Sequence, residues 1–245
     1  MNTMRSVVMH ATGGSEVLHL SEVPKPARVN AEFLIKVVAA GVNPIDFKTR
    51  SGAGASSAIT SFPVILGNDF SGVVVESPYG AHQIKEFLSV PGTALARKPR
   101  ALSHVEAAAV PLAALTAWGA VVDVAKAHAG QRMLIHAGAG GVGHFAIQFA
   151  TYFGANVITT GSTRNAGWLR ELGASEVIDY STTRFEDVVT DLDVVIDLIG
   201  NTVDDTGSRS LSVLKPGGLI VNLPTGSWPG LADDAAAAGV RATGY

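Results

Sequence analysis

The chain of 245 residues contains no cysteine. Without thiol groups it can form no disulfide bond, no thiolate zinc site and no cysteine nucleophile, so three common kinds of chemistry are excluded at once. The composition gives no sign of an oxidising compartment. A cytoplasmic location is therefore the expectation.

Charged residues are also scarce, at 16% of the chain, and the net charge of -3 comes with no long basic cluster. This composition lacks the electrostatic footprint of a nucleic-acid-binding protein. Hydrophobic residues make up 47% of the chain, which excludes extensive disorder. The expected partner is a small molecule, not a nucleic acid.

No apolar run is long enough to suggest a membrane span. The longest, residues 107–122, is interrupted by Pro111 and falls short of the roughly 20 residues that a spanning helix needs. The first six residues lack the apolar core of a signal peptide. We therefore expect no membrane partner and a buried helix in this run.

The most informative stretch of the sequence is glycine-rich and lies between a predicted strand at 132–136 and a predicted helix at 141–153. Its spacing is G-x-G-x-x-G, which in this context is typical of dinucleotide binding. The glycines allow a tight turn, a close approach of the backbone to a pyrophosphate and close packing of helix on strand. A tight turn without a ligand is the alternative, but it does not require four glycines in six residues. The expected cofactor-binding loop consists of Gly138, Ala139, Gly140, Gly141, Val142 and Gly143.

The chain before this loop has the pattern of a β-rich lobe that fits a small barrel. The predicted strands are 5–10, 17–20, 33–38, 70–76 and 84–90. Ser103 and Glu106 form a candidate capping box that opens a helix, which Pro111 interrupts before it continues through 112–126. We expect this helix to join the two lobes.

After Gly130 strands and helices alternate, which predicts a doubly wound parallel sheet. The predicted strands are 132–136, 156–160, 176–179, 193–199 and 219–223, with a further strand beginning in 240–245. The predicted helices are 141–153, 165–172, 184–189, 203–214 and 231–239. The chain is therefore expected to be an α/β protein with one domain at 1–110 and another at 111–245.

The segment after the second strand of this alternation indicates which nicotinamide cofactor is bound. An NAD-selective site presents a carboxylate about 20 residues after the first glycine. This chain instead has Ser162, Thr163 and Arg164, whose hydroxyls and guanidinium can bind a 2′-phosphate. The pattern favours NADP(H). Alternatively, Ser162 or Thr163 only caps the next helix, which would not exclude phosphate binding.

Five segments in order along the chain resemble the zinc-independent quinone oxidoreductases, relatives of zeta-crystallin in the medium-chain dehydrogenase/reductase superfamily. They are GVNPID (41–46), LGNDFSG (66–72), PLAALTAW (111–118), LIHAGAGGVG (134–143) and LKPGG (214–218). The resemblance implies a GroES-like barrel followed by a Rossmann domain, NADPH as cofactor and a homodimer. Quinone, enone and enoyl-thioester reductases share these motifs, so the substrate stays open.

The resemblance also implies where parts of the cofactor lie. It places the catalytic Asn43 and Thr116 near the nicotinamide, Gly140 to Val142 at the pyrophosphate, and Ser162, Arg164 and Tyr180 around the adenosine phosphate. Leu198 and Pro224 end strands at the carboxyl edge of the predicted sheet, where ligands of such sheets bind, and are expected to line the nicotinamide pocket. Tyr180 could equally serve only in packing.

No metal site is expected. Zinc-dependent relatives have cysteine or histidine and glutamate where this chain has Asn68 and Asp69, so these motifs cannot assemble the usual zinc ligands. Asp46 and Asp69 could act as acid or base, but each follows a loop signal that favours a turn cap. His136 and His144 flank the glycine loop and are expected to pack there.

A site without zinc restricts the hydride acceptor to compounds that are already activated. The resemblance therefore predicts an NADPH-dependent reductase of quinones or α,β-unsaturated carbonyls, with Asn43, Thr116 and a cofactor ribose hydroxyl stabilising the developing oxygen charge. The alternative is a protein that keeps the scaffold without reducing anything. It would be a nucleotide-binding structural protein, or would bind or shape a pathway intermediate.

The family pattern is shortened in this chain at two places. A hairpin is missing after 71–76, where Glu76 runs directly into Ser77, and the closing segments beyond Tyr245 are missing. Both losses would leave unpaired strand edges. Either residues of a longer protein are absent, which the combination favours, or a truly short chain covers its edges with a second copy and has lost activity.

Overall fold

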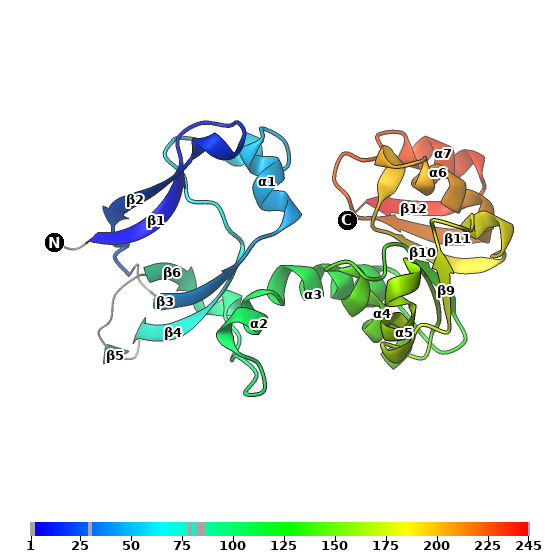
Figure 1. The fold of residues 1–245 in the computed structure, drawn as a ribbon, viewed down its shortest axis with the longest axis horizontal. Coiled ribbons are helices and arrows are strands. Elements are labelled where there is room, and N and C mark those ends of the chain that lie inside the picture. The colour runs from blue at the N-terminus through cyan, green and yellow to red at the C-terminus, as the bar shows by residue number, and fades with distance from the viewer. Residues whose placement is uncertain (1–2, 29–30, 78–79, 82–86, 245) are drawn as a thin grey trace. The chain divides into compact units, whose positions relative to one another are not determined.

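A computed structural model describes residues 3–28, 31–77, 80–81 and 87–244 of the chain. The chain divides into two compact units, Met1–Leu112 and Ala113–Tyr245 (Figure 1). No helix within these described ranges is long and apolar enough to cross a membrane.

The first unit contains two antiparallel sheets, which fits the predicted β-rich lobe. One sheet pairs β1 (Thr3–Met9) with β2 (Leu18–Pro24), and the other has the order β5 (Gly80–Ala81), β4 (Asp69–Ser77), β3 (Glu32–Gly41) and β6 (Phe87–Pro91). A single bridge between Met9 and Val64 extends the pairing of β1. Residues 84–86 of the predicted strand 84–90 lie outside the described residues.

The helices α1 (Pro44–Arg50), α2 (His104–Ala108) and α3 (Pro111–Trp118) each begin at a residue that favours a helix N-terminus. The predicted capping box is confirmed at α2, because Ser103 Oγ accepts from Glu106 N at 3.2 Å and Glu106 Oε2 from Ser103 N at 2.8 Å. Pro111 opens α3, which passes into a π-helical turn, Gly119–Val124. The helix α1 was missed by the sequence analysis.

The second unit is built on a six-stranded parallel sheet, as predicted. Its order is β12 (Arg241–Gly244), β11 (Leu214–Asn222), β10 (Leu192–Asp197), β7 (Arg132–Ile135), β8 (Asn156–Gly161) and β9 (Glu176–Asp179). Numbered from β7, this is the 3-2-1-4-5-6 order of dinucleotide-binding sheets read from the β9 edge. The direction of chain progression therefore reverses between β7 and β10, and ligands of such sheets bind at that point.

The helices of this unit are α4 (Gly143–Tyr152), α5 (Ala166–Glu171), α6 (Thr206–Ser210) and α7 (Leu231–Ala237). Gly154 and Gly173 follow α4 and α5 with positive φ angles of 86° and 113°, so both helices end at the predicted glycines. The predicted helix 184–189 is wrong, because only one 3₁₀ turn forms there, at Phe185–Asp187. The predicted helix 203–214 is reduced to α6 and a 3₁₀ turn, Leu211–Val213.

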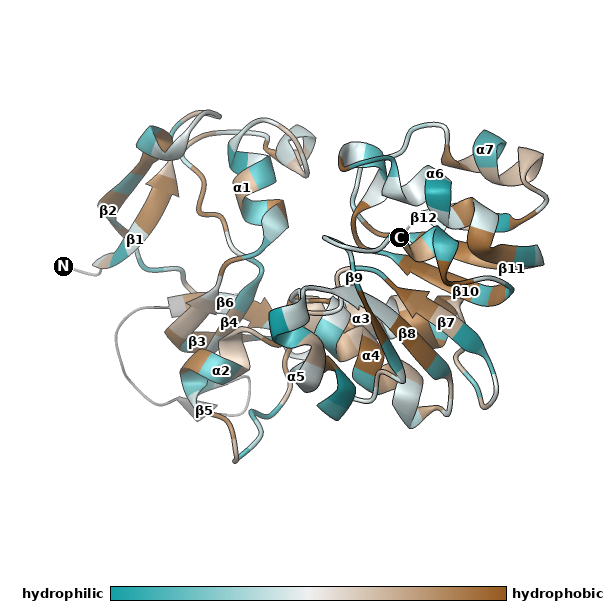
Figure 2. Ribbon diagram, turned by 45° about the vertical axis from the view of Figure 1, so that its right-hand side comes forward, coloured by the Kyte–Doolittle hydropathy of each residue, from teal (hydrophilic) through white to brown (hydrophobic). Residues whose placement is uncertain are grey.

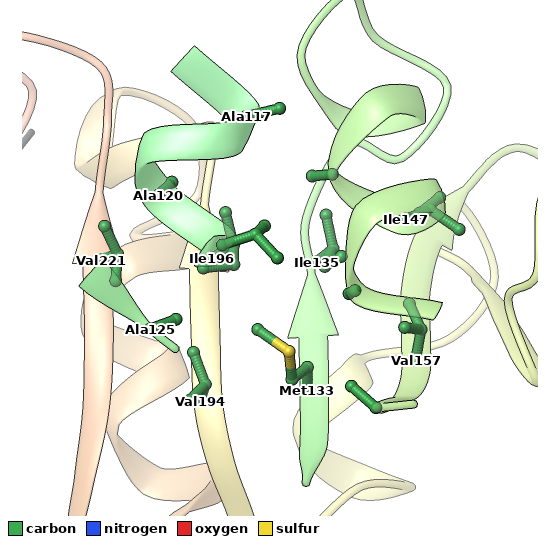
Figure 3. Packing of buried hydrophobic residues seen from close by; sticks show 14 of the residues in the cluster. Ala117, Ala120, Ala125, Met133, Ile135, Ile147, Val157, Val194, Ile196 and Val221 are labelled. Carbon is green, nitrogen blue, oxygen red and sulfur yellow. The ribbon is translucent and has the colours of Figure 1, made fainter. Parts of the chain in front are cut away.

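The sheet of the second unit is buried on both faces. Met133 and Ile135 of β7 point to one face, where they pack with Ala120 of the π-helical turn and Ile147 of α4 (Figure 3). Leu134, between them, points to the other face and joins a separate apolar cluster. Figure 2 shows β7, β8 and β10 as mainly hydrophobic, which explains why the sequence presents them as short apolar runs.

Candidate active site

The glycine loop connects β7 to α4 by a tight turn. Gly138 N donates to Thr160 O at 3.0 Å, and Gly140 N donates to Ala137 O at 2.9 Å. A Cβ atom at Gly138 would overlap Thr159 Oγ1, and one at Gly143 would overlap Ala137 O. These two positions therefore need glycine for the packing of the loop itself.

Gly140 and Gly141 both lie at the surface. A Cβ atom at Gly140 would still come 3.1 Å from Ala137 O, so only Gly141 has a different reason to be glycine. A Cβ atom at Gly141 would meet nothing within 4 Å. Among the hydrogen bonds of the described chain, none uses the N–H group of Gly141 or Val142. Open space and unused N–H groups at the start of the ten-residue helix α4 fit a bound pyrophosphate.

The buried His136, just before the glycine loop, binds the Thr160 hydroxyl that also accepts from the backbone of this loop. His136 Nδ1 lies 3.3 Å from Thr160 Oγ1, which also accepts from Ala137 N at 3.0 Å. His136 Nε2 lies 2.9 Å from Ser210 Oγ, whose own proton goes to Thr206 O at 2.7 Å. Nε2 therefore carries the histidine proton, and Nδ1 accepts from Thr160.

Complete burial lowers the pKa of His136 to about 4, so the ring is neutral at physiological pH. His144, on the other side of the loop, has Nδ1 2.9 Å from Gly140 O and stacks its ring on Trp168. Both histidines thus have the packing places that the sequence suggested.

The segment after β8 is held by an acidic residue that the sequence analysis did not single out. Asp179, the last residue of β9, accepts from Thr163 N at 2.7 Å and from the Thr163 hydroxyl. It also accepts from Ser181 N at 2.9 Å and Ser181 Oγ at 2.6 Å. Hydrogen bonds from Ser181 and Thr163 hold the pKa of the Asp179 carboxyl well below its usual range.

In this structure the N–H and the hydroxyl of Thr163 are both directed to Asp179. Arg164 is exposed, and no described residue forms a hydrogen bond or ion pair with its side chain. Ser162 Oγ accepts from Asn165 Nδ2 at 3.3 Å, and Tyr180 is 67% exposed. The side chains of Arg164 and Tyr180 are thus accessible to an anion. Both residues follow strand ends that lie side by side, because Gly161 at the end of β8 pairs with Asp179 at the end of β9.

Leu198 and Pro224 follow β10 and β11, and both are partly buried at the carboxyl edge of the sheet, as expected. The strand residues before them, Asp197 and the nearby Asn222, were not singled out from sequence. Asp197 is completely buried, and its Oδ2 accepts from Asn222 Nδ2 at 2.8 Å.

Asn43 lies in the first unit, just before α1. Its side-chain Nδ2 donates to Asp69 Oδ2 at 2.9 Å, and Asp69 Oδ1 accepts from Leu112 N at 2.9 Å. Asp46 Oδ2 accepts from Asn43 N at 2.7 Å, and Asp46 Oδ1 from Asn68 Nδ2 at 2.9 Å. Asp46 therefore caps the start of α1, which is the role the sequence favoured for it. Asp69 caps no turn: it is a buried residue of β4 that binds the Asn43 side chain and the distant Leu112 N.

Thr116 is half-buried in α3 and belongs to the second unit. No side-chain hydrogen bond within the described part of the chain involves its hydroxyl. The hydroxyl is thus not committed to another residue.

Around Asn68 and Asp69, the described residues do not offer a set of zinc ligands. Both carboxylate oxygens of Asp69 already accept N–H groups, and its neighbour Asn68 donates to Asp46. Within residues 3–28, 31–77, 80–81 and 87–244, no group of three or more histidine, aspartate or glutamate side chains could hold a metal ion.

Comparison with known families and proteins gives consistent matches. Residues 30–91 match the alcohol dehydrogenase GroES-like domain, and residues 141–230 match the family described as zinc-binding dehydrogenase. The chain is 36% identical over 238 residues to 2-methylene-furan-3-one reductase of Solanum lycopersicum, covering 86% of this chain and 60% of the relative. It is 35% identical over 222 residues to NAD(P)H oxidoreductase RTN4IP1, mitochondrial, of Danio rerio, covering 76% and 57%. The chain thus spans less than two thirds of these relatives.

Solved structures are similar over nearly the whole chain. The quinone oxidoreductase from Coxiella burnetii matches with a TM-score of 0.88 and 36% identity, over 99% of this chain and 82% of that one. The Escherichia coli quinone oxidoreductase complexed with NADPH matches with a TM-score of 0.84 and 27% identity, over 98% and 80%.

Proposed function

Because the chain belongs to the quinone-oxidoreductase-like group of the medium-chain dehydrogenase/reductase superfamily, we propose that it is an NADPH-dependent, zinc-independent reductase of quinones or α,β-unsaturated carbonyl compounds. The observation that carries this proposal is the glycine loop, with its open Gly141 and unused N–H groups at the start of α4. The second unit contains the glycine loop assigned to the cofactor, and the first unit contains Asn43, which is assigned to the substrate.

The residues at the carboxyl edge of the sheet would hold NADPH in three places. The N–H groups of Gly141 and Val142 would bind the pyrophosphate. Arg164, with Ser162 and Tyr180, would bind the 2′-phosphate, because a guanidinium forms strong hydrogen bonds to phosphate oxygens. Leu198 and Pro224 would line the nicotinamide. When bound, NADPH supplies a hydride from nicotinamide C4.

Asn43 and Thr116 would act on the substrate. The oxygen of a quinone or conjugated carbonyl gains negative charge as the hydride arrives, and positioned N–H and O–H donors stabilise that charge. Asn43 Nδ2 has one N–H directed to Asp69 and a second left for a ligand. The Thr116 hydroxyl is the other donor, and solvent supplies the final proton. Zinc independence is supported by the engagement of both Asp69 oxygens with N–H groups.

The test is consumption of NADPH by the purified chain with a panel of quinones, conjugated enones and enoyl thioesters, with and without a chelator. We expect turnover of at least one acceptor class and no effect of the chelator. Enhancement of NADPH fluorescence without turnover of any acceptor would contradict the proposal and favour a nucleotide-binding protein that is not a reductase.

The homodimeric state and the cytoplasmic location are also proposed. The first is what the family resemblance of the five sequence segments implies, and the absence of cysteine accords with the second. Light scattering after gel filtration should give twice the chain mass of 25.3 kDa. A monomeric mass at micromolar concentration would contradict the dimer.

A further inference from the structure

A buried carboxylate stands at the point where two neighbouring strands of the sheet end. Asp197 ends β10, Asn222 ends β11, and the two residues are paired in the parallel register. Asp197 has no exposed surface. Its Oδ1 accepts from Ile199 N at 2.9 Å and Gly200 N at 2.8 Å, and its Oδ2 accepts from Asn222 Nδ2 at 2.8 Å.

No cation accompanies this carboxylate, since none of the ion pairs formed by the described residues includes Asp197. A buried carboxylate is unfavourable unless hydrogen bonds replace the lost water. Three N–H donors do so here, and each has a fixed direction. The Asp197 side chain therefore determines the geometry of the backbone that supplies two of these donors.

That backbone forms the loop after Leu198. Gly200 has a positive φ of 71°, and a Cβ atom there would overlap Ser227 Oγ, so this loop packs directly on the loop after Pro224. Ser227 Oγ donates to Asn222 Oδ1 at 3.3 Å, and Ser227 N donates to Pro224 O at 3.0 Å. The second loop is thus held through Asn222.

We propose that Asp197 and Asn222 form a positioning pair that fixes the loops bearing Leu198 and Pro224, and so orients the nicotinamide half of the cofactor. β10 adjoins β7 at the reversal of the sheet, where a dinucleotide crosses the edge. On this proposal the buried pair acts through Leu198 and Pro224 and does not touch the cofactor itself. The inference rests on the proposed function, because it requires NADPH to bind at this edge.

The polarity of the pair provides a sharp test. In Asp197→Asn, the new amide would face the N–H₂ group of Asn222 as it is now oriented. Asn222 would then have to turn its amide over, and Ser227 would have to change from donor to acceptor, so the arrangement of the pair is lost. In Asn222→Asp, two carboxylates would oppose one another. The double exchange Asp197→Asn with Asn222→Asp restores every bond. The amide introduced at position 197 would accept from the two backbone N–H groups and donate to the carboxylate introduced at position 222, which would still accept from Ser227.

The experiment measures the affinity of wild type and variants for NADPH and for 2′-phospho-ADP-ribose, which lacks the nicotinamide. We expect each single variant to bind NADPH roughly tenfold more weakly, as for a lost buried hydrogen bond, and to bind the fragment as wild type does. The double exchange should restore NADPH affinity. Asp187→Asn, which removes an exposed carboxylate of the same unit, serves as the matched control.

Two results with the single variants would overturn the proposal: equal losses for NADPH and the fragment, or binding of both as in wild type. Failure of the double exchange to restore a folded single variant would also overturn it. If the single variants do not fold, Ser227→Ala tests the outer bond, with an expected loss of about threefold for NADPH alone. No change with Ser227→Ala would then refute the pair. If wild type binds neither the fragment nor NADPH, the proposed function fails instead.

Discussion

The carboxylate of Asp179 accepts hydrogen bonds from both the N–H and the hydroxyl of Thr163. Because Thr163 follows β8 and Asp179 ends β9, these bonds hold the ends of the two strands together. Ser181 donates to the same carboxylate from the segment after β9. Arg164, the residue after Thr163, is left exposed and without a partner among the described residues. The 2′-phosphate should therefore be bound chiefly by Arg164 and not by Thr163.

Arg164→Glu tests this division. Reversing the charge should weaken NADPH binding by about 1.5–3 kcal/mol, roughly tenfold to more than a hundredfold, because it removes a charge-assisted hydrogen bond to phosphate. NADH has no 2′-phosphate and should bind as before. The measurement is the dissociation constant of each cofactor from nicotinamide fluorescence. Equal losses for the two cofactors would refute the assignment.

Thr163→Val is the matched comparison at the neighbouring position. This substitution removes the hydroxyl that donates to Asp179, while the backbone N–H that also donates to Asp179 remains. We expect a much smaller change in the ratio of NADPH to NADH affinity than Arg164→Glu produces. A ratio that falls as far with Thr163→Val would mean that the hydroxyl binds the phosphate directly.

Replacing glycine by alanine at two positions of the glycine loop, 143 and 141, should have opposite effects on stability and on NADPH binding. Gly143→Ala places a Cβ atom against the Ala137 carbonyl, so it should destabilise the second unit by about 1–3 kcal/mol. Gly141→Ala meets open space and should leave the stability unchanged while weakening NADPH, because the methyl group occupies the space assigned to the pyrophosphate. Chemical denaturation and cofactor titration of both variants check this. Destabilisation by Gly141→Ala, or unchanged NADPH affinity in it, would contradict the prediction.

Much of the second unit could be predicted because its signals are local. The apolar run at Met133 to Ile135, the glycines and the helix-ending Gly154 and Gly173 each determine their own backbone. The helix at Pro44 also had a local signal, since Asn43 precedes a proline at the first helical position and Asp46 follows at the third.

The failures depend on contacts between residues far apart in sequence. Residues 184–189 have helical apolar spacing, but Glu186 is held by Arg209, 23 residues later, and only a single turn forms. Asp197 lies within a predicted strand, and its partner Asn222 is 25 residues away. The first pairing depends on how α6 packs against the turn at Phe185–Asp187, and the second on the register of the sheet, and neither can be inferred from local sequence.

Asn43→Ala should lower kcat with a conjugated enone by roughly tenfold to a thousandfold, the effect of losing one donor to a developing oxygen charge. NADPH affinity should be unchanged. Asn68→Ala, which removes an amide that binds Asp46 on the exposed side of the same loop region, is the control and should retain full turnover. Unchanged turnover in Asn43→Ala would exclude Asn43 as the donor.

The buried His136 predicts how stability depends on pH. Burial lowers its pKa to about 4 in the folded state, against 6.5 for the ordinary side chain. Below pH 6.5 the unfolded chain binds a proton that the folded chain does not, so stability is full above this pH and falls as the pH decreases toward 4. Between pH 7 and pH 5 the loss should be about 2 kcal/mol.

The range from pH 7 to pH 5 distinguishes the titration of His136 from that of Glu186. Arg209 and other hydrogen-bond donors lower the pKa of Glu186 to about 2 although burial opposes this, so Glu186 loses its contribution only below about pH 4.5. His136→Gln keeps an acceptor for Thr160 and a donor for Ser210 but does not titrate, and it should flatten the stability curve between pH 7 and pH 5. His128→Gln, at an exposed position, should keep the wild-type slope. Denaturant unfolding followed by tryptophan fluorescence at several pH values measures the slopes, and an unchanged slope in His136→Gln would show that another group carries the titration.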